Sequence, residues 1–381
     1  MINVLIVSHS LIPSVLLCGH SQLNYLKSKN KIDYKFTEAA AVTSGLLSWS
    51  DIIIFIRSES RFESYISTIC KSAKKHLVYV LDDDLLNVPD YLSSSSYYLR
   101  KDIQDNIKKI MNNCDTFLTS SPVMLEKYGK QFKNAYQIHE PSLNTIDHKE
   151  SNDIIKIGFA GSIDRAQDIN EILQEALEKN IIKYKDSIQV EFMGARPDIV
   201  DKYNLTYIPY TSSYEEYTKV IQERNWDIGL APMPDSEFHA CKYFNKYVEY
   251  ASFGIAGIYS NVKPYTFGIK DQYNGLLTDN SPENWFNAIS KLIDDNKLRK
   301  SIQNNCIKEA KTIYSLEILA DDYLQKILVD YDYTKSRTKI NSLVVFRIIT
   351  VFEQLINKIK EHKLYFPIWL IKKVFSKIKK D

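Results

Sequence analysis

The sequence predicts an α/β fold made of two Rossmann-like domains that face each other across a cleft, followed by an amphipathic helical tail. Two series of short apolar runs alternate with segments of helical apolar spacing, which predicts two parallel sheets covered by helices. A polar, turn-rich stretch separates the two series. The length of 381 residues also suits two domains of roughly 150 residues each, with additional segments.

The first domain is predicted over residues 1–143. Its expected strands are four apolar runs, at residues 3–7, 51–56, 76–81 and 116–119. Helical spacing lies between them, most clearly at residues 61–74 and 101–113. Continuous apolar strands with helices between them are typical of a parallel sheet that is covered on both faces.

The apolar pattern stops at residues 144–152, which we predict to be a linker, and resumes in a second domain over residues 153–330. The expected strands of this domain are residues 154–160, 189–193, 227–231 and 257–259. Helical patterns dominate residues 283–328. Because ligands bind beyond the carboxyl ends of parallel strands, we sought candidate residues directly after the strands.

Composition argues against several classes of protein. Hydrophobic residues make up 44% of the chain and charged residues 25%, which indicates a globular protein. The five cysteines form no Cys-x-x-Cys pair, so neither a disulfide framework nor structural zinc is expected, and a reducing cytoplasm fits. No Gly-x-Gly-x-x-Gly or Gly-x-Ser-x-Gly motif occurs, which argues against a dehydrogenase or a serine hydrolase. We expect no signal peptide and no membrane-spanning helix.

A group of charged residues follows the expected strand at residues 227–231. Lys242, Lys246 and Glu249 are spaced three or four apart, which places them on one face of a helix. A carboxylate there can accept hydrogen bonds from a ribose diol, and a lysine with the helix N-terminus can hold a diphosphate. The alternative is a solvated helix face that is stabilised by Lys–Glu pairs.

The run from residue 227 to residue 260 resembles the retaining GT-B glycosyltransferases of the large family 4-like group that includes sucrose synthase. In that family, the glutamate that binds the donor ribose is followed by Ala-x-x-x-Gly-x-Pro. The run Glu249-Tyr-Ala-Ser-Phe-Gly-Ile-Ala matches the glutamate and the glycine of this motif, with Ala256 in place of the proline. Cys241 stands where the family usually has another glutamate, close to the reacting sugar.

Bacterial surface-polysaccharide members of this family carry a variant of the motif, Phe-x-x-x-Lys before Lys-x-x-Glu-Tyr, and this chain fits it from Phe238 to Tyr250. The resemblance implies a nucleoside diphosphate sugar as donor, retention of anomeric configuration, and no metal or other cofactor. It also implies that Gly161, Ser162 and Arg165, which follow the strand at residues 154–160, approach the donor diphosphate. The alternative is an ordinary turn before a helix.

Three adjacent carboxylates, Asp82, Asp83 and Asp84, follow the strand at residues 76–81. Such a cluster needs cations, hydrogen-bond donors or water around it. In a GT-B enzyme this strand end faces the acceptor, where a carboxylate can orient or deprotonate the acceptor hydroxyl. One alternative is the metal-holding Asp-x-Asp pair of GT-A glycosyltransferases, and another is a helix N-cap cluster.

Histidines near strand ends are further candidates. His9 follows the first strand and is predicted to line the acceptor side of the cleft as a catalytic residue. The segment His139-Glu140-Pro141-Ser142 and the lone His239 are weaker candidates, because isolated histidines are more often structural.

The tail, residues 331–381, is predicted to bind a membrane surface. Residues 340–381 carry nine Lys and Arg against three Asp and Glu, although the whole chain has a net charge of only +2. Apolar residues recur there with helical spacing on one side, which is typical of a basic amphipathic helix at an anionic membrane. The near-neutral body argues against nucleic-acid binding. The alternative is a pair of helices packed on the body or in a dimer.

Together these features predict a cytoplasmic glycosyltransferase, peripheral at the inner face of the cell membrane, that acts on a glycan or lipid-linked acceptor in surface-polysaccharide assembly. Two alternatives remain. One is a GT-B sugar-nucleotide epimerase, and the other is a catalytically degenerate GT-B scaffold, for which Cys241 is the best support.

Overall fold

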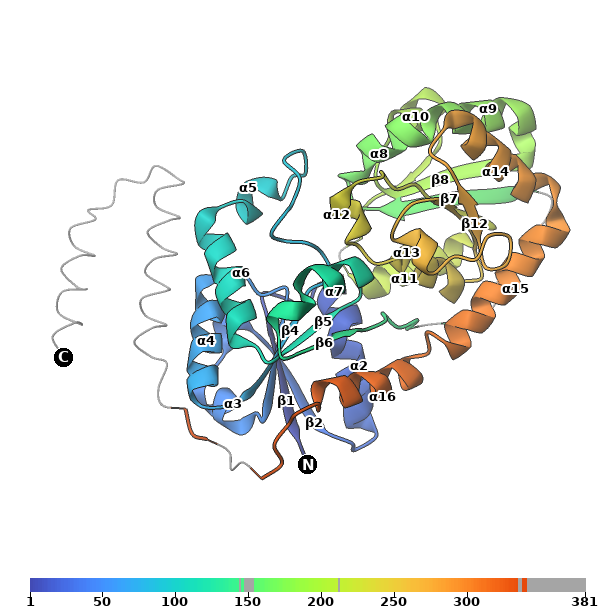
Figure 1. The fold of residues 1–381 in the computed structure, drawn as a ribbon. Helices are drawn as coiled ribbons and strands as arrows, with labels where there is room; N and C mark the ends of the chain where they lie inside the picture. The colour runs from blue at the N-terminus through green and yellow to red at the C-terminus, as the bar shows by residue number, and fades with distance from the viewer. Residues whose placement is uncertain (144, 147–153, 212, 335–337, 341–381) are drawn as a thin grey trace.

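The computed structural model describes residues 1–143, 145–146, 154–211, 213–334 and 338–340. These residues form two α/β domains that lie side by side (Figure 1). Each domain contains a six-stranded sheet in which every pair of neighbouring strands is parallel. The predicted arrangement of two Rossmann-like domains is therefore confirmed.

The first sheet has the strand order β2-β1-β3-β4-β5-β6. Its strands are β1 (Asn3–Ser8), β2 (Asp33–Glu38), β3 (Ile52–Ile56), β4 (His76–Val80), β5 (Thr116–Thr119) and β6 (Asn134–Gln137). The helices of this part of the chain are α1 (Pro13–Val15), η1 (Leu16–His20), α2 (Ser21–Ser28), η2 (Ala39–Ala41), α3 (Ser44–Trp49), α4 (Arg61–Ser72), α5 (Ser95–Tyr98), α6 (Lys101–Asn113), α7 (Pro122–Tyr128) and η3 (Gly129–Gln131).

The second sheet has the strand order β12-β11-β10-β7-β8-β9. Its strands are β7 (Ile155–Gly161), β8 (Ile188–Gly194), β9 (Thr206–Ile208), β10 (Ile228–Ala231), β11 (Ala256–Ser260) and β12 (Leu276–Thr278). The helices that follow β7 are α8 (Arg165–Ile172), α9 (Gln174–Tyr184), η4 (Lys185–Ser187), α10 (Asp198–Lys202), α11 (Tyr214–Arg224), α12 (Glu237–Ala240), α13 (Asn245–Ser252), η5 (Tyr265–Phe267), α14 (Pro282–Asp294), α15 (Asn296–Thr312) and α16 (Leu316–Ile327).

Each sheet is buried on both faces. Since successive residues of a strand point to opposite sides, each strand contributes to two apolar cores. In β1, Val4 and Ile6 belong to one apolar core, whereas Leu5 and Val7 belong to the core on the other face. The second sheet separates its two cores in the same way. This arrangement explains the continuous apolar runs in the sequence.

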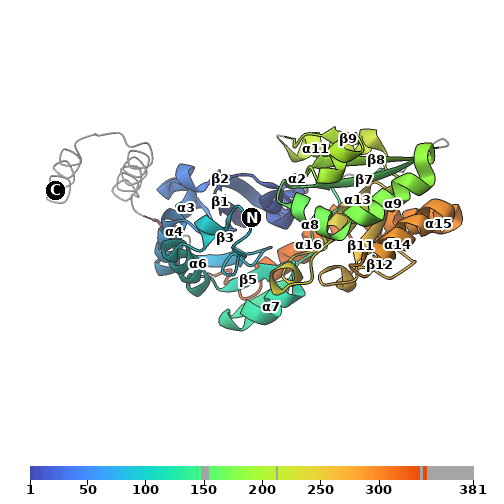
Figure 2. The same ribbon diagram turned by 90° about the horizontal axis from the view of Figure 1, so that it is seen from above.

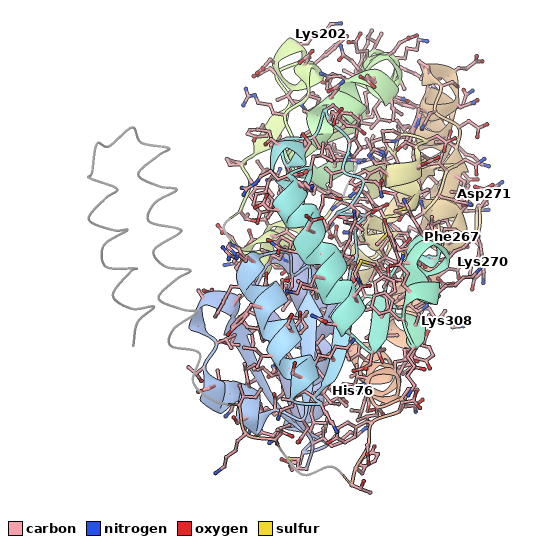
Figure 3. The ribbon with its side chains drawn as sticks, turned by 60° about the vertical axis from the view of Figure 1, so that its left-hand side comes forward. His76, Lys202, Phe267, Lys270, Asp271 and Lys308 are labelled. Carbon is pink, nitrogen blue, oxygen red and sulfur yellow. The ribbon has the colours of Figure 1, made fainter. Side chains whose placement is uncertain are left out.

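The strand order of the second sheet reverses between β7 and β10. From β7 the chain builds outward through β8 and β9 on one side, and it later builds through β10, β11 and β12 on the other. The two crossover connections therefore leave a crevice at the carboxyl ends of β7 and β10. Figure 3 shows His76, the first residue of β4, on the side of the first domain that lies away from the second domain, so β4 runs toward the cleft.

Helix α16 leaves the second domain and packs on the first. Its residues Ala320, Tyr323 and Ile327 join the apolar core that also contains Val4 and Ile6. The helix lies beside α2 in both views (Figures 1 and 2). The sequence analysis included α16 in residues 153–330 because its apolar spacing does not reveal which domain covers it.

The tail predicted over residues 331–381 lies mostly outside the described residues. The last described residue, Ile340, is buried in the core of the first domain, and its backbone N–H donates to the Ser48 hydroxyl at 2.9 Å. Within the described ranges, no helix has both the length and the apolar character needed to cross a bilayer.

A tight contact at the centre of the second sheet gives a test of this packing. A Cβ atom at Gly158 would lie 1.8 Å from the buried ring of Trp226, whose Nε1 is fixed by a 2.8 Å hydrogen bond to Glu191. We therefore expect Gly158→Ala to lower the free energy of unfolding by at least about 2 kcal/mol in urea titrations. Gly45→Ala is the matched control, since its nearest neighbour is 3.7 Å away, and it should not destabilise the protein. Equal stability of the two variants would contradict this packing.

Candidate functional site

Two adjoining cavities lie between the domains at the carboxyl ends of the strands. The inner cavity is about 260 Å³ and the outer cavity about 610 Å³. Gly161, Ser162 and Lys246 line both, so the two spaces form one continuous site. All six residues that the sequence analysis assigned to the donor line these cavities: Gly161, Ser162, Arg165, Lys242, Lys246 and Glu249.

The outer cavity has an apolar rim, and part of its wall is backbone without side chains, at Gly161 and Gly194. Leu11 and Ile12 from the first domain and Tyr210 from the second form exposed parts of its lining. Gly161 and Gly194 are paired at the ends of β7 and β8. Gly194 has a φ of +78°, and a Cβ there would lie 2.2 Å from the carbonyl oxygen of Gly161, so only glycine fits. This edge of the sheet is therefore open to a ligand.

Glu249 is held on α13 at the boundary of the outer cavity. Its Oε2 accepts hydrogen bonds from Lys246 Nζ at 2.5 Å and from the Tyr217 hydroxyl at 3.0 Å. The glutamate and lysine side chains are only 11% and 18% exposed. Two donors on one oxygen fix the carboxylate in place, and its cavity side is available to a ligand.

Arg165 begins α8 and lines the inner cavity directly after β7. Its guanidinium donates to the Pro232 carbonyl oxygen and pairs with Asp168 at 3.0 Å. These contacts fix the guanidinium at the carboxyl ends of β7 and β10, where the order of the sheet reverses. The arginine is thus placed to neutralise an anion bound in the crevice.

Lys242 connects the two domains. It was expected on the same helix as Lys246, but it lies in the turn between α12 and α13, because Phe244 departs from helical geometry with a ψ of 43°. From this turn its Nζ reaches Asp83 of the first domain at 2.8 Å. Lys242 still lines the inner cavity, together with Lys246.

Asp82 and Asp83 line the inner cavity opposite the donor-side residues. One nitrogen of Arg57 lies 2.9 Å from Asp82 Oδ1 and 3.0 Å from Asp83 Oδ2. Burial opposes ionisation of Asp83, but Lys242 and Arg57 outweigh it and hold the pKa of that carboxyl well below its ordinary value. Asp83 is therefore an ionised bridge between a cation of each domain.

Asp84 points away from the cavities. Its carboxylate is 1% exposed and is bonded to Lys127 Nζ at 2.7 Å, to the Tyr128 hydroxyl at 2.7 Å and to Asn87. Cys241 lies 4.0 Å from its Oδ2. The structure therefore does not bring Asp84 together with the other two aspartates, because Lys127, Tyr128 and Asn87 hold its carboxylate in a buried position. Within the described part of the chain, no group of three His, Cys, Asp or Glu side chains converges as metal ligands do.

The histidines lie away from the cavity lining. His9 is exposed just after β1 and is not among the residues that line the two cavities. His239 is buried on α12, where its Nδ1 meets the Ser236 hydroxyl at 2.8 Å. Burial, with the positive charges of Arg165 and Lys242, lowers the pKa of His239 to about 4, so this ring is neutral at physiological pH.

Arg57 and Glu140 are the cavity-associated residues that sequence reasoning underrated. Arg57 was not singled out, although it directly follows β3; its backbone has a φ of +49°, which is uncommon outside glycine. Glu140 was only a weak candidate, yet it is buried and lines the inner cavity. Position after a strand was the available signal for Arg57, whereas nothing local in the sequence marks the burial of Glu140.

Comparison with known proteins identifies the fold. No protein-family model matches the chain, and no curated protein matches its sequence. HepE from Anabaena, solved with UDP and glucose, is 12% identical over 86% of this chain and 99% of its own, with a TM-score of 0.57. Sucrose-phosphate synthase from Thermosynechococcus elongatus is 13% identical over 85% of this chain and 98% of its own, with a TM-score of 0.61.

A third solved structure has been assigned as a UDP-N-acetylglucosamine 2-epimerase of Listeria monocytogenes. It is 11% identical over 89% of this chain and 99% of its own, with a TM-score of 0.56. These similarities extend over nearly the whole of each neighbour, so the chain has the two-domain GT-B fold that the sequence analysis expected. At such low identity they establish the fold alone.

The ion cluster around Arg57 gives a test of the site. We expect Arg57→Ala to lower the free energy of unfolding by about 3 kcal/mol, because it leaves the partly buried Asp82 without its cation and Asp83 with Lys242 alone. Arg100→Ala is the control, since that arginine pairs with Asp102 on the surface, where such pairs contribute at most about 1 kcal/mol. Adding Asp82→Asn should recover part of the loss. Equal costs for the two arginines in urea unfolding would contradict this account.

Proposed function

We propose that this protein is a glycosyltransferase that moves a sugar from a nucleoside diphosphate sugar to an acceptor. One observation carries the proposal: Glu249, Lys246 and Arg165 line one continuous site at the carboxyl ends of β7 and β10. A fixed carboxylate beside cations suits a ligand that has a diol next to a diphosphate.

The two cavities differ in a way that suits the parts of such a donor. The outer cavity, with Tyr210, Tyr214 and the bare backbone at Gly194, suits a nucleoside. Glu249 at its boundary suits the ribose hydroxyls. The smaller inner cavity suits the diphosphate and the sugar. The neighbour HepE, which has the same fold and was solved with UDP and glucose, supports this assignment.

The acceptor is proposed to enter from the first domain. Asp82 and Asp83 form the wall of the inner cavity that faces the donor-side cations. Asp83 is ionised and tied to two cations, so it is a weak base, and it would orient an acceptor hydroxyl by accepting its hydrogen bond. Asp84 and His9, which do not line the cavity, have no such direct role in this proposal.

Metal independence is part of the proposal. Arg165, Lys242 and Lys246 would supply the positive charge that stabilises the departing nucleoside diphosphate. Retention of anomeric configuration rests on the resemblance of the residue 227–260 run. A thermal-shift screen of nucleoside diphosphates and their sugars in EDTA tests the donor assignment, because a ligand at a hundredfold its dissociation constant stabilises a protein by about 2.7 kcal/mol. Binding only after manganese is added would overturn metal independence.

The neighbour assigned as an epimerase supports a second candidate function with the same donor site. A sugar-nucleotide epimerase would convert the donor without an acceptor. Incubating the protein with each donor that binds, and identifying the products, distinguishes the two functions. Transfer only in the presence of a glycan acceptor supports the glycosyltransferase, whereas an epimeric product without acceptor supports the alternative. The scaffold alternative requires that no nucleotide sugar binds at all.

Glu249 gives the sharpest test of the donor site. We expect Glu249→Ala to weaken nucleoside diphosphate binding by about 1.5–3 kcal/mol, because charge-assisted hydrogen bonds to the ribose are lost. Isothermal titration measures the change. Glu223→Ala is the control, since Glu223 lies in the same domain on α11 with a side chain that is 62% exposed. Unchanged affinity in folded Glu249→Ala protein would remove the ribose assignment.

We further propose that the tail beyond Ile340 holds the protein at the inner face of an anionic membrane, where the acceptor is lipid-linked. Its basic amphipathic sequence supports this, and the chain enters it from the first domain, on the acceptor side. Each lysine near such a surface contributes about 1 kcal/mol. Truncation before Ser342 should therefore abolish sedimentation with anionic vesicles and spare transfer to a short water-soluble acceptor. Full-length protein that ignores anionic vesicles at low salt would show that the tail is structural.

A further inference from the structure

Glu140 occupies a central place in the cleft that the proposed function does not use. It lies where the chain leaves β6 and crosses toward the second domain, and it is only 5% exposed. It lines the inner cavity with Arg165, Lys242 and Lys246. It also lines a small neighbouring pocket with Glu249. A carboxyl group is thus buried between the two halves of the site.

The partners of Glu140 set it apart from the other carboxylates of the cavities. Asp82 is paired with Arg57, Asp83 with Lys242 and Arg57, and Glu249 with Lys246. In the described structure, Glu140 instead has the thiol of Cys18, whose Sγ lies 3.7 Å from its Oε1. It is therefore the carboxyl group of the inner cavity with no cation in direct contact among the described residues.

The groups around Glu140 make its ionised form unfavourable. Burial is the main cause, and the negative charges of Asp82 and Glu249 act in the same direction. The Ser120 hydroxyl and the Cys18 thiol oppose them, although the Ser120 oxygen is not in hydrogen-bond geometry with the carboxyl. Together these effects raise the pKa of Glu140 to about 8. The carboxyl group therefore keeps its proton at neutral pH.

The protonation state decides what Glu140 offers to a ligand. A protonated carboxyl has one O–H donor, whereas an ionised carboxylate only accepts hydrogen bonds and repels phosphate. Ser120, which is fully buried beside it, also has a hydroxyl oxygen without a hydrogen-bond partner in the described structure. The Ser120 hydroxyl is thus a buried polar group beside the cavity that described protein groups do not satisfy, as can occur next to a ligand site.

We propose that Glu140 is a donor-binding residue that acts in its acid form, donating its O–H to an oxygen of the diphosphate in the inner cavity. This role rests on the proposed function, since it requires a nucleoside diphosphate in that cavity. It adds to the cations a neutral donor that contributes a hydrogen bond without a further positive charge. It also makes donor binding depend on pH, because deprotonation replaces this hydrogen bond with repulsion between two anions.

The test is a titration of UDP into the full-length protein at pH 7 and at pH 9.5. We expect the affinity of the wild type to fall about tenfold at the higher pH, as for one added charge near the phosphate in a partly screened site. Glu140→Gln keeps an N–H donor and cannot ionise, so its affinity should change much less between the two values. The control Glu175→Gln, at an exposed position on α9, should behave like the wild type. An equal pH dependence in wild type and Glu140→Gln would overturn the proposal.

Thermal unfolding separates this inference from the proposed function. A raised pKa means that the folded protein binds the proton of Glu140 more tightly than the unfolded chain does. Stability is therefore lost as the pH rises from the ordinary value of 4.5 toward about 8. The melting temperature should fall more steeply between pH 6 and pH 9 in the wild type than in Glu140→Gln, with no ligand present.

Each outcome then has a distinct meaning. If neither protein binds UDP, the donor assignment and the ligand contact of Glu140 both fail, although the difference in melting would still identify a buried acid. If the wild type binds UDP with the same affinity at both pH values, only the role of Glu140 fails. Should Glu140→Gln not fold, Cys18→Ala replaces it: loss of the thiol that donates to the carboxyl and lowers its pKa should move the midpoint of the affinity change to higher pH. An unmoved midpoint would overturn the proposal.

Discussion

The ionised bridge at Asp83 is the interaction on which the cleft depends. It joins Arg57 of the first domain to Lys242 of the second, so two α/β units that could each pack alone are fixed face to face. Arg57 lies directly after β3 and Lys242 lies in the turn between α12 and α13, and the local sequence of neither shows that they share Asp83. The two ion pairs of Asp83 form because the strands of both sheets have their carboxyl ends at the same cleft. The architecture thus creates the cleft, and the bridge joins its two walls.

The backbone also ties the two domains together, because the chain crosses between them twice at nearly the same place. The first crossing follows β6, and the second precedes α16. Ser142 and Ser315 form a bridge between the crossings, and the Ser142 N–H donates to the Tyr314 carbonyl oxygen at 2.8 Å. Helix α16 then packs its apolar face on the first sheet. Two tied crossings restrict the relative motion of the domains, so residues of both domains can share one ligand.

Much of this arrangement could be predicted from the sequence, and the misses have a common cause. The sequence analysis found the central strands, which are continuous apolar runs, but not β2, β6, β9 and β12, which are the four edges of the two sheets. An edge strand is only partly covered, so its sequence lacks such a run; every residue of β9 is half-buried. The site follows the same rule. Position after a strand identified Arg165 and Asp83, whereas the Pro232 carbonyl that fixes Arg165 and the Lys242 that pairs with Asp83 come from distant parts of the chain.

The charges of the cleft bear on how the proposed diphosphate would bind. In the structure, Lys242 is neutralised by Asp83, Lys246 by Glu249 and Arg165 by Asp168. A diphosphate must compete with these carboxylates for the cations, and an additional ionised carboxylate at Glu140 would add to the repulsion. Burial prevents that ionisation near neutral pH. The three cations are thus held in place by three carboxylates. Because its surroundings keep Glu140 neutral, this residue adds no further negative charge that would repel a bound diphosphate.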